Sequence, residues 1–186
     1  MKKLFGLIVL CALSLNVHAQ EPLTFKGIPI DGNLSTFIEK VKNIGFKELL
    51  VSNHSAVVEG EFTGEQCRVI IQASEATNTV FSVGITLKEA NKWDSLKYTY
   101  DEYKDLLISK YGKGESFEHF AYPYDKEGLE MIALMNNKCT YATFFNLPIN
   151  RIFIMISYVS GSGNVSLVYI NKKNQTLAEK EKLNDL

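Results

Sequence analysis

The stretch RVIIQASEATNTVFSVGITLKE, residues 68–89, decides the fold, because apolar and polar residues alternate along much of it. Successive side chains of a β-strand point to opposite faces, so this alternation predicts strands with one buried face. The stretch RIFIMISYVSGSGNVSLVYINK, residues 151–172, has the same pattern. The two stretches begin at Arg68 and Arg151, the only arginines of the chain, and align without a gap. Each stretch is therefore predicted to form two strands joined by a turn.

Outward from these stretches, each half of the chain shows a helix followed by strands. Residues 34–44 have apolar positions at helical spacing and are followed by Gly45, and residues 100–111 have the same features before Gly112. Glycine often ends a helix because it adopts positive φ without strain. The predicted strands, bounded by turn residues, are 46–51, 56–62, 68–74 and 79–88 in the first half and 115–121, 139–146, 151–159 and 164–172 in the second.

The two halves resemble each other closely enough to predict an internal repeat. The predicted fold class is α+β, a tandem duplication of a helix plus a four-stranded antiparallel meander, with the helices packed on the sheet. Segment 122–137 is an insertion in the second copy, for which a short helix is preferred to a strand. The predicted half-repeats and the C-terminal helix span about residues 23–92, 93–174 and 175–186.

The N-terminus has the pattern of a cleavable signal peptide over residues 1–19. Lys2 and Lys3 precede an apolar run, which is shorter than the roughly 20 residues that span a bilayer. A lipoprotein acylated at Cys11 is the less favoured alternative, because bulky Leu10 precedes the cysteine. The sequence therefore predicts an exported chain, periplasmic or secreted, with one mature domain over residues 20–186.

The composition argues against two classes of partner. Without Lys2 and Lys3, 18 basic residues face 21 acidic ones, which gives a charge of −3. Nucleic-acid binding depends on clustered Lys and Arg, so no nucleic-acid partner is expected. No segment after residue 19 has the length and hydropathy of a membrane span.

Cys67 and Cys139 are the cysteines that remain after cleavage. In an oxidising compartment they can form a disulfide, and buried they can serve as free thiols that pack like small apolar residues. The disulfide is the preferred interpretation.

Three stretches carry a resemblance to a known family: FKGIPIDG at residues 25–32, KCTYATFF at 138–145 and the ending LNDL. They resemble a family of small exported bacterial proteins of unknown function, and the likeness covers nearly the whole mature chain. The resemblance implies export and assigns no functional residue. The expected architecture is also similar to tandem β-lactamase-inhibitor-like proteins, a likeness of fold that carries no function.

The sequence contains no recognisable catalytic or metal-binding motif. His54 and His119 are far apart and no HExxH or CxxC grouping is present. Glu59 and Glu61 share one face of a predicted strand, where they fit the wet side of a sheet better than the paired carboxylates of a hydrolase. The chain is therefore predicted to be no enzyme and to need no cofactor.

Aromatic residues are unusually dense between residues 93 and 124. Exposed Tyr and Trp give rigid contact area to partners, so the predicted binding residues are Trp93 in the expected linker and Phe120, Tyr122 and Tyr124 at the insertion. Packing against the edge of the sheet is the competing interpretation. The preferred function is a non-enzymatic binding module for a protein or peptide of the cell envelope. The alternatives are a glycan-binding or small-molecule-binding protein and a hydrolase of envelope polymers.

Overall fold

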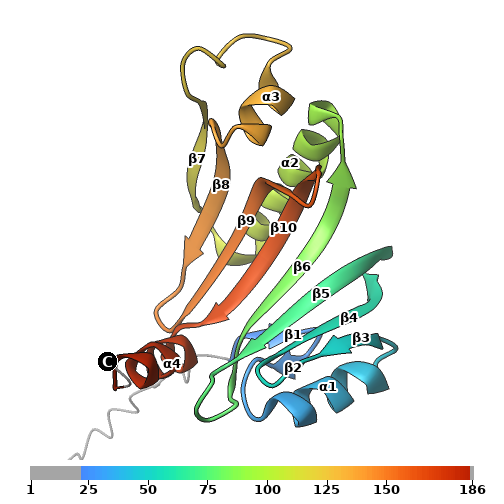
Figure 1. Ribbon diagram of the computed structural model, residues 1–186, viewed down its shortest axis with the longest axis vertical. Helices are drawn as coiled ribbons and strands as arrows, with labels where there is room; N and C mark the ends of the chain where they lie inside the picture. The colour runs from blue at the N-terminus through green and yellow to red at the C-terminus, as the bar shows by residue number, and fades with distance from the viewer. Residues whose placement is uncertain (1–21, 185–186) are drawn as a thin grey trace, which may run out of the picture.

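The computed structural model describes residues 22–184, and the expected signal peptide at 1–19 lies outside the described residues (Figure 1). The elements of the first half are β1 Thr24–Phe25, β2 Ile28–Pro29, α1 Leu34–Asn43, β3 Lys47–Val51, β4 Ser55–Phe62, β5 Glu65–Ala73 and β6 Val80–Ala90. The elements of the second half are α2 Trp93–Tyr111, β7 Glu115–Phe120, α3 Glu130–Met135, β8 Cys139–Asn146, β9 Asn150–Val159, β10 Ser162–Asn171 and α4 Lys172–Asn184. The α+β class predicted from the sequence is confirmed.

Helices α1, α3 and α4 fall close to their predicted places, whereas α2 begins seven residues earlier than the predicted start at residue 100. Helix α1 begins after Asn33, whose side-chain Oδ1 accepts a hydrogen bond from the Ser35 backbone N–H at 3.0 Å. Helix α2 begins at Trp93, so this residue is the first of a helix and the linker predicted around it is wrong. Asp94 in the first turn favours this early start, because a carboxylate interacts well with the positive end of a helix. The ribbon of β1 and β2 was not predicted.

The longer strands form one continuous antiparallel sheet. Its order is β3-β4-β5-β6-β10-β9-β8-β7, with β6 and β10 paired at its centre. The predicted tandem duplication of a four-stranded meander is therefore wrong, because all eight strands are hydrogen-bonded into one sheet. Figure 1 shows α1 beside β3–β5 and α2 behind β9 and β10.

The predicted alignment of the halves holds in one pair of strands and fails in the next. Val69 of β5 and its counterpart Ile152 of β9 are both fully buried. In the following strand, however, buried Ile85 is aligned with partly exposed Val168, and Ile85 in fact pairs with Leu167. The β5–β6 ladder contains an irregularity next to its turn that the β9–β10 ladder lacks. A shift of one residue reverses the face of every side chain, so the duplicated register is not present.

One face of the sheet, called the covered face here, carries the core. Its central row is Val58, Val69, Ile85, Leu167 and Ile154, which lie opposite one another on successive strands and are at most 1% exposed. The helix residues that complete this core are Leu34, Phe37, Ile38 and Val41 of α1 and Leu96, Tyr100 and Leu107 of α2. Because strand side chains alternate, the neighbours of the central row point to the opposite face, called the open face.

Candidate functional site

The open face carries a row of apolar residues that crosses seven of the eight strands. Each member lies directly opposite the next in the ladder register. This apolar row consists of Leu50, Val57, Ile70, Gly84, Val168, Phe153 and Phe144. The sheet therefore has apolar side chains on both faces at its middle, where a sheet with one solvated face would carry polar residues.

The apolar row is exposed at Leu50 and Ile70 and partly exposed at its other positions. Leu50 is 65% exposed and Ile70 is 44% exposed, while the rings of Phe144 and Phe153 pack together with centroids 5.5 Å apart. At Gly84 an added Cβ would lie 3.8 Å from the nearest side chain, so packing does not require glycine there.

A second feature, called the slot here, lies between β5 and β6. These strands pair from Ala73–Val80 to Arg68–Thr86 and then separate. Beyond that point residues 65–67 of β5 pair with β4, while residues 88–90 of β6 pair with β10. Figure 1 shows the two strands diverging.

Two sequence features account for the separation. Leu87 is an extra residue in the β6–β10 ladder, and a bulge of this kind bends a strand and increases its twist. A continued β5–β6 ladder would also place Glu65 opposite Glu89, and like charges at opposed positions are destabilising. The facing edges of 65–67 and 88–90 therefore lie outside any ladder of the described sheet.

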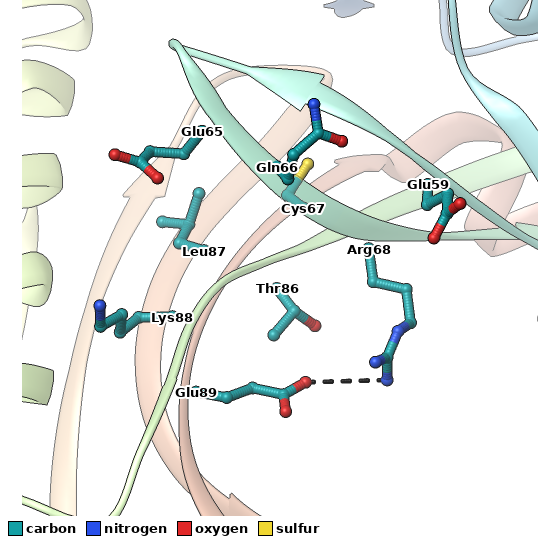
Figure 2. Close-up of a pocket in the computed structure, with 9 residues that line it drawn as sticks. All are labelled: Glu59, Glu65, Gln66, Cys67, Arg68, Thr86, Leu87, Lys88 and Glu89. Atoms are coloured by element: carbon teal, nitrogen blue, oxygen red, sulfur yellow. Dashed lines mark ion pairs between the residues drawn. The ribbon is translucent and has the colours of Figure 1, made fainter.

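A cavity occupies each side of the slot. The open-face cavity has a volume of about 360 Å³ and is lined in part by Glu59, Arg68 and Glu89 (Figure 2). The helix-side cavity has a volume of about 380 Å³, and Tyr98 and Leu106 of α2 form part of its wall. The residues that line both cavities are Glu65, Leu87 and Lys88. The slot thus lies between a charged space on the open face and a groove along α2.

The charged groups of the slot are only loosely paired. The Arg68 guanidinium lies 3.7 Å from the Glu89 carboxylate, and both side chains are about half exposed. Glu59 lies opposite Arg68 across the β4–β5 ladder. In Figure 2, Glu65 and Lys88 point away from Arg68, toward the other side of the slot. On the helix side a hydrogen bond between the Thr63 and Tyr103 hydroxyls joins the β4–β5 turn to α2.

The four predicted binding residues separate into two groups. Trp93 and Phe120 pack against Tyr141 between α2 and the sheet, with Trp93 centroid distances of 5.2 Å and 4.8 Å to the two rings. Tyr122 is 84% exposed in the insertion, where Tyr124 is partly exposed. The first pair thus fills the covered face, and the second pair stands free of that cluster. A binding role for the second pair stays a prediction.

The predicted disulfide is wrong. Cys67 in β5 is a buried free thiol, and Cys139 at the start of β8 is a half-buried free thiol. Burial raises the pKa of Cys67, and burial raises the pKa of Cys139 to about 12. Both thiols therefore stay protonated at neutral pH and lack the thiolate that nucleophilic chemistry requires.

The covered face also contains a polar network beside the aromatic cluster. The fully buried Tyr100 hydroxyl lies 2.7 Å from the Thr143 hydroxyl and donates to Glu118 at 3.1 Å. Lys104 Nζ donates to the same Glu118 carboxylate at 2.7 Å. Burial is the main reason that the pKa of Tyr100 is raised well above its usual value. The network satisfies polar groups within the core, so its role is structural.

The remaining candidate residues do not come together in a catalytic or metal-binding site. Glu59 and Glu61 are exposed on β4. Arg68 of β5 and Arg151 of β9 are separated in the sheet by β6 and β10. Among residues 22–184 no group of three or more His, Cys, Asp or Glu side chains is placed to hold a metal ion. Within the same range no helix is long and apolar enough to cross a membrane.

The comparisons with known proteins add no assignment. No family model matches the chain, and neither the curated proteins nor the solved structures give a significant match. The resemblance to small exported proteins therefore stays a prediction.

The sequence contained a signal for the apolar row, but periodicity alone did not show which apolar residues lie on the open face. Residues 69–71 and 152–156 are apolar at odd and even positions alike, which is typical of strands with two apolar faces. Their partners across the ladder became apparent only from the register of the folded sheet. The slot left no comparable signal, because it depends on which strands stop pairing.

Proposed function

We propose that this protein is an exported, non-enzymatic binding module that recognises a protein or peptide through the open face of its sheet. The apolar row from Leu50 to Phe144 is the observation that carries the proposal. Contiguous exposed apolar surface on a folded protein is typical of an interaction site, because covering it with a partner removes it from water.

The insertion extends this surface in the proposal. The Phe117 ring lies 6.0 Å from the Phe144 ring at the end of the row, and β7 runs from Phe117 toward exposed Tyr122. A partner lying along the row can thus reach the loop on the same side of β7 and β8. This arrangement supports a contact role for Tyr122, whereas Trp93 and Phe120 support the loop from the covered face.

A peptide-display selection on the immobilised protein tests the proposal. Selected peptides are then titrated against the wild type, Phe153→Ser in the row and Gln72→Ser on the same face outside it. Burial of a phenyl side chain by a partner contributes about 1.5–3 kcal/mol, so Phe153→Ser is expected to weaken binding about tenfold or more. Gln72→Ser should leave the affinity unchanged.

Unfolding curves of both variants show whether the fold is intact before affinities are compared. Equal affinity of all three proteins for the selected peptides would refute a role of the apolar row in binding. Selection of glycans from a parallel glycan array, with no peptide bound, would replace the proposed partner class.

A further inference from the structure

The slot offers two strand edges to an incoming chain. Residues 65–67 of β5 and 88–90 of β6 face each other across it and pair only with their outer neighbours. Free backbone N–H and C=O groups on a strand edge are a template for an added strand. An extended polypeptide can therefore gain main-chain hydrogen bonds here without displacing any strand of the described sheet.

The two cavities receive opposite side chains of such a strand. Side chains of a strand alternate between the two faces of the sheet that it joins. The open-face cavity and the helix-side cavity lie on the two faces of the slot and share Glu65, Leu87 and Lys88 as their common wall. Odd and even residues of one added strand thus meet two different environments.

The open-face cavity is suited to a cationic side chain. Three carboxylates, Glu59, Glu65 and Glu89, line it against two cations, Arg68 and Lys88. The one ion pair between these lining residues is the 3.7 Å contact of Arg68 with Glu89, and Glu59 makes none within residues 22–184. A Lys or Arg of the ligand finds Glu59 and Glu89 on either side of the Arg68 guanidinium, which can turn away because it is more than half exposed.

The helix-side cavity is suited to an apolar side chain. Tyr98 is 72% exposed and Leu106 is 56% exposed, and both face this groove from α2. Leu87, the bulged residue of β6, also lines this groove. A Val, Leu or aromatic residue placed here covers three apolar side chains that are otherwise in contact with water.

We infer that the slot binds an extended peptide segment in which cationic and apolar residues alternate. The cationic residues enter the cavity with Glu59 and Glu89, and the apolar residues enter the groove with Tyr98 and Leu106. The inference rests on the proposed function, because it specifies the polypeptide that the same open face recognises. Arg68–Thr86 is the next pair on that face after Ile70–Gly84, so the slot continues the apolar row.

Fluorescence polarisation with labelled synthetic peptides tests the inference. The probe is Lys-Val-Lys-Val-Lys-Val, and its composition-matched control is Lys-Lys-Lys-Val-Val-Val. A third peptide repeats the alternating sequence with N-methyl groups on alternate amides, which removes strand pairing and keeps every side chain. The alternating peptide is expected to bind at least tenfold more tightly than either control.

Variants of the protein locate the site. Glu59→Gln combined with Glu89→Gln should weaken binding of the alternating peptide at least fivefold, and Leu106→Ser should weaken it without changing its salt dependence. Glu39→Gln combined with Glu48→Gln, two exposed carboxylates beside Lys42 that lie away from the open face, is the matched charge control. All of these side chains are exposed, so the fold is expected to survive the substitutions.

The outcomes separate the two proposals. Equal binding of the alternating and block peptides, or no binding of either, would overturn the slot inference. Loss of binding in Phe153→Ser with full binding in both slot variants would overturn it as well and leave the apolar row as the site. Loss in the slot variants with full binding in Phe153→Ser would retain the slot and remove the row from the proposed function.

Discussion

Two neighbouring isoleucines of β5 test which face of the sheet is covered. Ile71 is 0% exposed beneath the helices, whereas Ile70 lies in the apolar row and is 44% exposed. Replacing a fully buried Ile by Ala costs about 2–5 kcal/mol, because the transfer energy of the lost methylenes adds to that of the cavity left behind. Ile70→Ala removes a side chain that is already partly solvated, so its expected cost is about 1 kcal/mol.

The comparison is internally controlled. Both substitutions change the same residue type in the same strand, so the loss of strand propensity is common to both. We therefore expect Ile71→Ala to be the less stable variant by about 1–4 kcal/mol, since the difference reflects burial and cavity formation alone. For a chain of this size, that corresponds to a difference in Tm of roughly 2–16 °C.

Urea unfolding followed by circular dichroism and by fluorescence of Trp93 measures the difference. Equal m-values for the two variants would allow their midpoints to be compared directly. Equal losses of stability, or a larger loss for Ile70→Ala, would refute the assignment of the two faces. Such a result would also mean that another part of the protein covers the apolar row, so the row could not serve as a free binding surface.

Three further predictions concern the packing and the titratable groups. Gly163→Ala should destabilise the protein by about 1–3 kcal/mol, because its Cβ would lie 2.4 Å from Leu96 and 2.9 Å from a backbone oxygen. Gly84→Ala, with no contact closer than 3.8 Å, should change the stability by less than about 1 kcal/mol, and thermal unfolding of both variants checks the difference. Cys139 should react slowly with a thiol reagent at pH 8 and rapidly in urea, and a fast reaction of the native protein would contradict its burial. Because the folded pKa of Cys139 is about 12, above the unfolded value, its contribution to stability should be complete below about pH 8.5 and be lost as the pH rises toward 12. Tyr100→Phe should cost about 1–2 kcal/mol in urea unfolding, since it removes the buried bonds to Thr143 and Glu118, and an unchanged midpoint would show that the network contributes no stability.

Local sequence determined the identity of most elements. The alternation in residues 68–89 and 151–172 is sufficient for four strands, because a period of two places every second side chain on one face whatever the partner strand. Asn33 and Gly45 bound α1 in the same local way. The start of α2 was missed because Trp93 to Thr99 lacks a strong cap, and burial of Leu96 against the sheet stabilises that turn.

The disulfide and the aromatic site depend on tertiary structure and could not be predicted from local sequence. Two cysteines in an exported chain predict a bond, yet Cys67 and Cys139 lie on β5 and β8, with three strands between these two in the sheet order. Aromatic density near residue 93 predicted one contact surface. Strand alternation instead turned Phe120 toward α2, and the loop left Tyr122 in solvent.

The sequence by itself determined which segments become strands and helices and which side chains alternate, because these depend on backbone geometry and on neighbours within a few residues. The tertiary structure alone decided the apolar row and the slot. The row exists because seven residues from separate strands come into register, and a register shift of one residue would send its members to the other face. The slot exists because the bulge at Leu87 and the opposed Glu65 and Glu89 end a ladder between strands whose pairing is itself non-local.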